Sequence, residues 1–250
     1  MRIRILYVLA AVLAGVLAPW LAPASFAAAA VASGSTPLTS GEPVHGVVST
    51  VAGVSYTFTA VAGQHVTLAI TSPKVSPSGD RLQMQVYDPS GAADASGVII
   101  TTASTEIDFT PGSAQAGKTT VVISPYSFES TGSFTLTYAT DVTGALTSGV
   151  AVHGALKYGG QHAAYTFTAV AGQHVTLAIT SPAVSPTGDS LLMQVYDSSG
   201  ATDADGVYIN TGSTEIDFTP DSAQAGKTTV VISPYSFEST GSFTLTYTAG

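Results

Sequence analysis

Apolar and polar residues alternate with a period of two in short runs along most of the chain. In one such run, Val66, Leu68 and Ile70 alternate with Thr67 and Ala69. Similar runs occur at residues 56–58, 82–86, 107–109, 121–123 and 134–138. A period of two places every second side chain on one face, as in a half-buried β-strand, whereas a helix would show a period near 3.6. The pattern therefore predicts an all-β protein.

Turn-forming residues separate these runs. They occur at 62–64 (Ala-Gly-Gln), 77–80 (Pro-Ser-Gly-Asp), 89–91 (Pro-Ser-Gly) and 130–132 (Ser-Thr-Gly). Glycine, proline, serine and aspartate in such clusters favour turns for known conformational reasons. Short strands at this spacing are typical of two packed antiparallel sheets. We expect a jelly-roll-like antiparallel β-sandwich.

The chain contains a long internal repeat. The segment Tyr56–Tyr138 reappears without a gap as Tyr165–Tyr247, 109 residues further on, and the copies differ at eleven of 83 positions. Upstream the likeness is weaker, and one residue is inserted. Each copy has the size of a single domain. The sequence therefore predicts tandem domains at residues 33–140 and 141–250, with limited freedom at the short joint 140–144.

The first 32 residues have the pattern of a secretory signal peptide. Arg2 and Arg4 precede an apolar run from Ile5 to Leu21, and small residues follow. We expect cleavage that leaves a chain beginning between Ala28 and Ser33 and a secreted, extracellular bacterial protein. A retained membrane anchor is the alternative, although Pro19 and the lack of a following positive cluster argue against it.

Charge and cysteine content exclude several classes of partner and site. The formal net charge is −9, and without residues 1–32 it would be −11. Nucleic acids and anionic membranes are bound mainly through Lys and Arg, so neither is an expected partner. The chain has no cysteine, which excludes disulfides, thiolate metal ligands and a cysteine nucleophile.

The order of motifs in each copy resembles the bacterial pre-peptidase C-terminal (PPC) domain. In the first copy these motifs are Tyr56-Thr57-Phe58, Ala62-Gly63-Gln64, Gly79-Asp80, Val86-Tyr87-Asp88, Ala116-Gly117 and residues 132–136 (Gly-Ser-Phe-Thr-Leu), and the second copy repeats each. Where the family usually has aromatic residues after the Ala-Gly turn, this chain has residues 118–121 (Lys-Thr-Thr-Val). The resemblance implies a secreted β-sandwich module of the kind often appended to extracellular proteases.

Patterns for catalysis are scarce, and we do not expect an enzyme. The sequence has no Gly-x-Ser-x-Gly and no His-Glu-x-x-His, and its five histidines are scattered. Glu106 and Asp108, with their copies Glu215 and Asp217, share a strand face about 6 to 7 Å apart, which overlaps the spacing of inverting glycosidase acids. A glycoside hydrolase is therefore a remote alternative.

Acidic residues after two predicted strands are candidate calcium ligands. They are Asp88, Asp94, Asp197, Asp203 and Asp205. Carboxylates close together in a loop suit calcium, but the distal Glu of a full calcium loop is missing. Solvated turn carboxylates are the alternative, and no other cofactor is expected.

Aromatic residues in the loop before the last strand of each copy are the candidate ligand-binding residues. They are Tyr126, Phe128, Tyr235 and Phe237. Aromatic side chains contribute large contact areas to interfaces. The alternative is that the two phenylalanines cap the core of their domains.

These observations predict a secreted, non-catalytic tandem binding module for an extracellular polysaccharide or a structural protein. Two weak sites on a short linker would gain avidity on one polymer. A secreted structural or partner-binding accessory protein without a polymer ligand is the alternative. The oligomeric state is left open.

Overall fold

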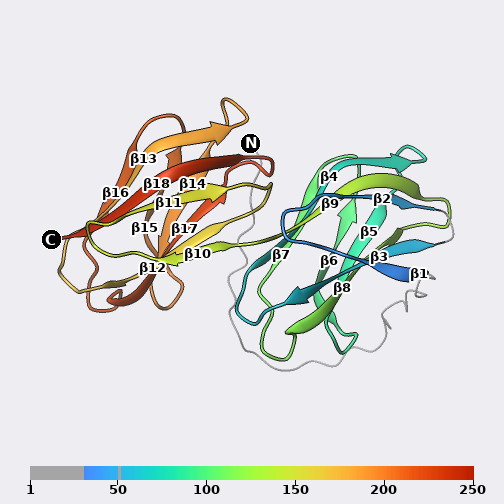
Figure 1. The fold of residues 1–250 in the computed structure, drawn as a ribbon, viewed down its shortest axis with the longest axis horizontal. Helices are drawn as coiled ribbons and strands as arrows, with labels where there is room; N and C mark the ends of the chain where they lie inside the picture. The colour runs from blue at the N-terminus through green and yellow to red at the C-terminus, as the bar shows by residue number, and fades with distance from the viewer. Residues whose placement is uncertain (1–30, 50–51) are drawn as a thin grey trace, which may run out of the picture.

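The computed structural model describes residues 31–49 and 52–250, so residues 1–30 of the predicted signal peptide lie outside the described residues. Figure 1 shows two β-sandwiches that lie end to end. The described residues form strands and turns, as the sequence predicted, and the all-β tandem sandwich is confirmed. None of the described segments is a helix with the length and apolar character needed to cross a membrane.

The first domain packs a five-stranded sheet, in the order β1-β3-β8-β5-β6, against a four-stranded sheet, in the order β2-β9-β4-β7. Its strands are β1 (Val31–Pro37), β2 (Val44–Val48), β3 (Gly53–Ala60), β4 (Val66–Ser76), β5 (Leu82–Tyr87), β6 (Ala93–Ile100), β7 (Thr105–Phe109), β8 (Gly117–Pro125) and β9 (Thr131–Thr140).

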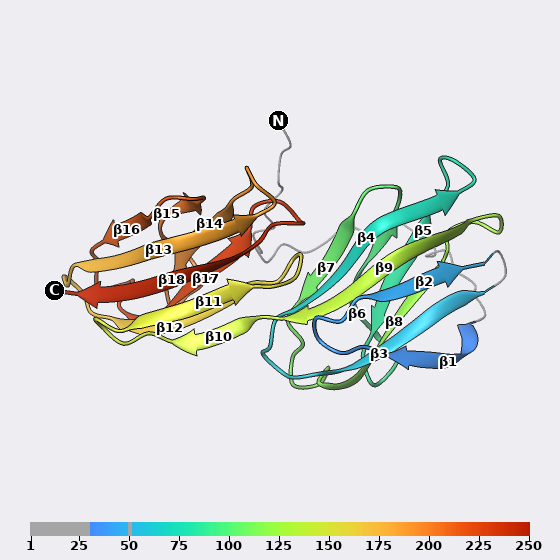
Figure 2. The ribbon, with the colours of Figure 1, turned by 45° about the horizontal axis from the view of Figure 1, so that its top comes forward.

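The second domain repeats this arrangement with sheets β10-β12-β17-β14-β15 and β11-β18-β13-β16. Its strands are β10 (Val142–Ala145), β11 (Ala151–Leu156), β12 (Ala163–Ala169), β13 (Val175–Ser185), β14 (Leu191–Tyr196), β15 (Thr202–Ile209), β16 (Thr214–Phe218), β17 (Gly226–Pro234) and β18 (Thr240–Ala249). Figure 2 shows the two layers of each domain.

Each sandwich has its own core, built from the alternation seen in the sequence. In β5, Leu82, Met84 and Val86 are fully buried between the sheets, whereas the intervening residues point outward. Stacked aromatic rings join the sheets in both copies, with centroids 4.4 Å apart for Phe58 and Tyr138. Since apolar burial is the main stabilising term in a chain without disulfides, each core holds its own domain together.

Two features of the sheets differ from the expected antiparallel pattern. The first strand of each five-stranded sheet, β1 or β10, pairs in parallel with its neighbour, β3 or β12. In addition, the acidic segments expected to be loops contain the edge strands β6 and β15. Buried and exposed residues alternate only weakly in β6 and β15. Each of these strands is bulged where it pairs with β5 or β14, and each has only one strand neighbour. Asp94, Asp203 and Asp205 therefore lie on strands.

The two domains meet head to tail at a polar junction. The Thr67 hydroxyl shares its hydrogen between the Asp108 carboxylate at 2.6 Å and the Gly160 carbonyl at 3.0 Å. The Gln161 side-chain amide donates a 3.0 Å hydrogen bond to the Thr140 carbonyl. The side chains of Thr67 and Gln161 are buried. Because β9 ends at Thr140 and β10 begins at Val142, the linker itself becomes an edge strand of the second domain. The joint is thus short and held by hydrogen bonds to both sides.

Candidate functional site

The loop between β8 and β9 presents two aromatic side chains at the free end of the first domain. Tyr126 is 51% exposed and Phe128 is 95% exposed. The loop that carries them is well fixed, because the Ser127 hydroxyl bonds to the Asp80 carboxylate at 3.0 Å and to the Ser130 hydroxyl at 2.8 Å. Loss of water contacts tends to raise the pKa of Asp80, but the hydrogen bonds from Ser130 and Ser127 outweigh it and lower that pKa. Phe128 therefore projects an exposed aromatic ring from a loop that hydrogen bonds hold in place.

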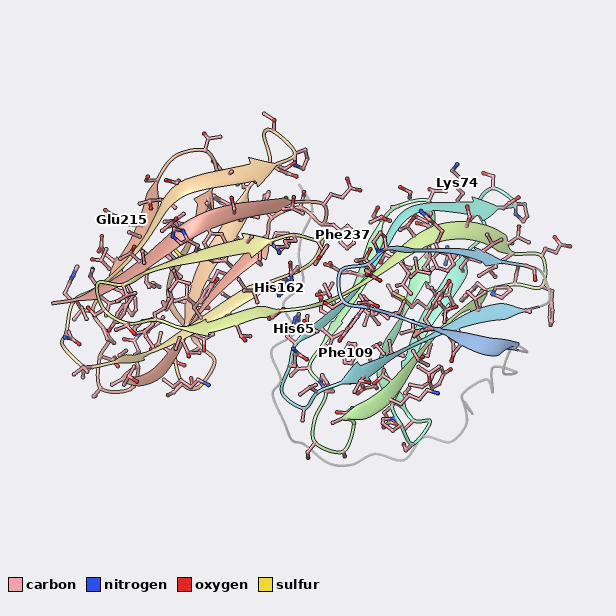
Figure 3. All side chains as sticks on the ribbon, viewed as in Figure 1. His65, Lys74, Phe109, His162, Glu215 and Phe237 are labelled. Carbon is pink, nitrogen blue, oxygen red and sulfur yellow. The ribbon has the colours of Figure 1, made fainter. Side chains whose placement is uncertain are left out.

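The corresponding loop of the second domain lies at the domain junction instead. The Phe237 carbonyl accepts a 3.1 Å hydrogen bond from the Gly160 backbone, and the Phe237 side chain is half-buried. The Ser104 hydroxyl of the first domain donates to the Glu238 carboxylate at 3.4 Å. In Figure 3, Phe237 lies between the two domains. The two phenylalanines thus have different surroundings, although their local sequences are identical.

An aromatic surface lies on the outer face of the five-stranded sheet of the second domain. Tyr208 of the edge strand β15 pairs with Leu192 of β14, which pairs with Ser233 of β17. Directly opposed residues share a face, and Tyr235 is two positions beyond Ser233. Leu192, Tyr208, Asn210 and Tyr235 therefore project on one side, and we refer to them as the Tyr208 face.

Tyr208 and Tyr235 form an exposed pair of rings on this face. Their centroids are 4.9 Å apart and their planes meet at 87°, while the side chains are 54% and 47% exposed. An edge-to-face arrangement is a favourable one for aromatic rings, and it orders the pair before any ligand arrives. Beside them, the Ser190 hydroxyl donates a 2.5 Å hydrogen bond to the Asn210 amide oxygen. The surface thus combines apolar rings with amide and hydroxyl groups.

Differences between the copies concentrate at this face. Three of the eleven substitutions within the repeat lie on it, and they are Gln83/Leu192, Ile99/Tyr208 and Thr101/Asn210, while a fourth, Arg81/Ser190, lies beside it. The equivalent surface of the first domain therefore has one tyrosine, Tyr126, where the second domain has a tyrosine pair. The repeat shows how many positions differ between the copies, but the sequence did not predict Tyr208, Leu192 and Asn210 as a site. Only strand pairing brings them together with Tyr235.

A shallow hollow continues the same outer face toward its other end. It is lined by Tyr196, Lys227, Thr229 and the turn 197–200. Tyr196 and Thr229 are register partners in β14 and β17, so the hollow is reached from the Tyr208 face along two neighbouring strands. A surface of this length suits an extended ligand better than a single small molecule.

The candidate calcium ligands take different roles. Asp88 accepts hydrogen bonds from the Ser90 hydroxyl at 2.6 Å and the Ala92 amide at 3.0 Å, which hold its pKa below the usual range, and Asp197 does the same in the second copy. Asp94 accepts a hydrogen bond from the Gln115 amide. In the described part of the chain, these carboxylates do not form a group with ligand atoms within 4.8 Å of one another. Calcium binding stays a prediction.

Asp203 stands out among these residues, because both of its carboxylate oxygens are buried without a hydrogen-bond partner. Burial raises its pKa, and the negative charges of Asp197 and Asp221 add to the increase. Asp205, on the same strand, is exposed. The neutral form of Asp203 is therefore favoured in the folded protein.

Glu106 and Asp108 are the candidate acids of the glycoside hydrolase alternative. They lie on β7, next to the domain junction. Asp108 accepts a 2.6 Å hydrogen bond from the Thr67 hydroxyl. A side chain added at Gly160 of the second domain would lie 2.9 Å from the Glu106 carboxylate, so this carboxylate abuts the other domain. The copies Glu215 and Asp217 lie away from the junction, and Figure 3 shows Glu215 at the far side of the second domain.

A group suited to a metal ion lies at the junction. Among the described residues it comprises His65, Asp141 and His162, all half-buried. Burial favours a lower pKa for His65, but the hydrogen bond and charge of Asp141 outweigh it and raise that pKa. Burial lowers the pKa of His162. The scattered positions of these residues gave no spacing motif in the sequence.

Comparisons with known proteins give a structural likeness only. Neither a family model nor a curated protein sequence matches the chain. In structure it is similar to the N-terminal CBM22-1-CBM22-2 tandem domain of Xyn10C from Paenibacillus barcinonensis, at 9% identity and a TM-score of 0.25, over 78% of this chain and 82% of that one.

Proposed function

We propose that the chain is a secreted, non-catalytic tandem binding module whose second domain holds an extracellular polysaccharide on the Tyr208 face. The observation that carries this proposal is the exposed Tyr208–Tyr235 pair, which lies where the two copies differ most. Tyrosine offers an apolar ring and a polar hydroxyl at low entropic cost, and amide and hydroxyl groups lie beside the pair. Such a surface fits a sugar ring, which has an apolar face and a polar rim.

The charge of the chain narrows the class of polymer. With a formal net charge of −9, the chain would repel strongly acidic polysaccharides at moderate ionic strength. We therefore propose a neutral polysaccharide, with contact extending along β14 and β17 toward Tyr196.

A depletion assay tests this function. The purified chain is mixed with insoluble cellulose, xylan, chitin and, for comparison, fibrillar collagen, and the unbound fraction is measured. We expect one neutral polysaccharide to deplete the chain, and Tyr208→Ala or Tyr235→Ala to weaken binding by about 1 kcal/mol or more each. Tyr126→Ala is the matched control in the first domain and should change little. Equal depletion by the Tyr208→Ala/Tyr235→Ala double variant would overturn the proposed face.

A protein partner is the second candidate, and Phe128 favours it. Phe128 is 95% exposed on a loop held by hydrogen bonds, so it offers a whole aromatic ring to an interface. If collagen rather than a polysaccharide depletes the chain, and Phe128→Ala rather than Tyr208→Ala weakens that binding, the partner-binding function replaces the polysaccharide function.

Export is part of the proposal. The resemblance to the PPC family and the apolar N-terminal segment both support secretion with cleavage between Ala28 and Ser33. Mass spectrometry of protein from the culture medium measures the new N-terminus. A chain that keeps Arg2 and Arg4 would contradict cleavage.

A further inference from the structure

The duplication provides an internal comparison for the group at the domain junction. His65 and His174 occupy equivalent positions 109 residues apart, but the equivalent of Asp141 is Gly250. His162 lies in the loop before β12, and the residue 109 positions earlier is Gly53. The His65 side chain is 26% exposed, whereas that of His174 is 59% exposed. At the other end of the second domain, His174 therefore has no counterpart of Asp141 beside it.

We propose that His65, Asp141 and His162 form a binding site for a divalent transition-metal ion of the zinc type, and that the bound ion links the two domains. This site is separate from the Tyr208 face and does not depend on the proposed polysaccharide function. It uses one residue from the turn before β4, one from the linker and one from the loop before β12.

The distances between the three side chains are close to those of a metal site. His65 Nδ1 lies 3.0 Å from Asp141 Oδ1, and the imidazole rings of His65 and His162 stack with centroids 4.8 Å apart. All three ligand atoms lie within 4.8 Å of one another. Two atoms bound tetrahedrally to one zinc ion at about 2.1 Å lie about 3.4 Å apart, so the widest pair needs to close by up to about 1.4 Å. Because the two rings are stacked with 17° between their planes, their nitrogen lone pairs converge on one ion only after the side chains rotate.

The backbone holds the two histidines on either side of the linker. The Asp141 amide lies 3.4 Å from the His65 carbonyl, and the next amide, that of Val142, donates a 2.9 Å hydrogen bond to the His162 carbonyl. The backbones of the two histidines are thus hydrogen-bonded to the consecutive residues Asp141 and Val142. Figure 3 shows His65 and His162 between the two domains. A preformed arrangement of this kind lowers the entropic cost of binding an ion.

The donor set and the nearby charges select the kind of ion. Two imidazole nitrogens and one carboxylate oxygen suit zinc, cobalt, nickel or copper, whereas calcium and magnesium prefer oxygen ligands alone. The carboxylates of Asp108 and Glu106 act electrostatically on His65, so the surroundings of the group are negative. Three protein ligands leave a fourth position for water, as in open zinc sites.

The test uses the purified chain without a histidine tag, stripped with EDTA and dialysed. Zinc chloride is titrated by calorimetry, and cobalt absorption reports ligation directly. We expect one zinc ion per chain, and His65→Ala, Asp141→Asn and His162→Ala should each weaken binding at least about tenfold, the loss that removing even an outer partner of a metal ligand causes. His174→Ala is the matched control, because it removes the equivalent histidine of the second copy, and it should leave zinc binding unchanged.

Thermal unfolding supplies the second measurement. Zinc should raise the melting temperature of the wild-type chain and of His174→Ala, but not that of His162→Ala, because an ion that binds only the folded junction stabilises it. Asp141→Asn keeps a hydrogen-bond acceptor beside His65, so the junction should still fold. A loss of zinc binding in this variant therefore reports the loss of a metal ligand. The proposal is overturned if the wild-type chain binds no more zinc than the triple variant, or if His174→Ala weakens binding as much as His65→Ala.

Discussion

The ring of Tyr208 meets that of Tyr235 edge to face, with 4.9 Å between their centroids, although they come from an edge strand and from the end of β17. In the first domain, the residue equivalent to Tyr208 is Ile99, so Tyr126 has no such partner there. Two nearly identical domains therefore carry different outer faces on the same scaffold.

Exchange of these residues between the copies should transfer binding. Tyr208→Ile with Leu192→Gln gives the second domain the residues of the first, and we expect it to weaken polysaccharide binding by about 1 kcal/mol or more, as measured by depletion. The side chains point away from the core, so the melting temperature should change little. The converse pair, Ile99→Tyr with Gln83→Leu, should add a second site and raise the apparent affinity for an insoluble polymer through avidity. If neither exchange alters binding, the face has been assigned wrongly.

Phe128 and Phe237 should respond differently to truncation. Phe128→Ala removes a side chain that is 95% exposed and should change stability by less than about 0.5 kcal/mol. Phe237→Ala removes a half-buried ring at the domain junction and should destabilise the second domain by roughly 1 kcal/mol. Thermal unfolding of the two variants measures the difference. Equal melting temperatures would show that the junction gains nothing from Phe237.

Asp203→Asn should stabilise the protein at pH 7. The folded-state pKa of Asp203 is raised by burial, so its contribution to stability is fully present below the usual pKa of 3.8 and is lost as the pH rises through the raised value. At pH 7 the ionised carboxylate has two buried oxygens without partners. Removing its charge should gain about 1 kcal/mol, or about 4 °C in melting temperature, and this gain should shrink toward pH 4.

Asp94→Asn is the matched control for Asp203→Asn, because Asp94 already accepts a hydrogen bond from Gln115 and should gain less. Melts in EDTA and in calcium chloride also test the calcium prediction. If Asp203 is a calcium ligand, calcium will raise the melting temperature of the wild-type chain and not that of Asp203→Asn. A lower melting temperature for Asp203→Asn in EDTA would contradict the electrostatic argument.

Gly154→Ala should destabilise the second domain. A Cβ at this position would lie 2.5 Å from the Phe243 ring and from the Tyr165 hydroxyl, closer than real contacts allow. Such overpacking costs roughly 1 to 3 kcal/mol, which a thermal melt resolves at about 4 to 8 °C per kcal/mol for a domain of this size. Gly212→Ala is the control, since no atom lies within 4 Å of a Cβ there. An unchanged melt for Gly154→Ala would mean that the two rings can move aside.

The strands with a clear alternation, such as β5 and β8, followed from the sequence, because a period of two has one simple physical cause. The bulged edge strands β6 and β15 did not, since their burial pattern depends on a single strand neighbour. The aromatic loops were predicted, but their unequal exposure was not. Phe237 lies against Gly159 and Gly160 of the loop before β12, contacts that depend on the tertiary structure.

The sequence by itself determined the all-β class, the tandem repeat and the residues that line each core. These features are local or periodic, so pattern and physical chemistry are enough to specify them. Only the tertiary structure decided that Tyr208 joins Tyr235, and that His65, Asp141 and His162 gather at the junction. Strand order and domain docking bring together residues that are distant along the chain, and no spacing motif records such contacts because the connecting residues play no part in them.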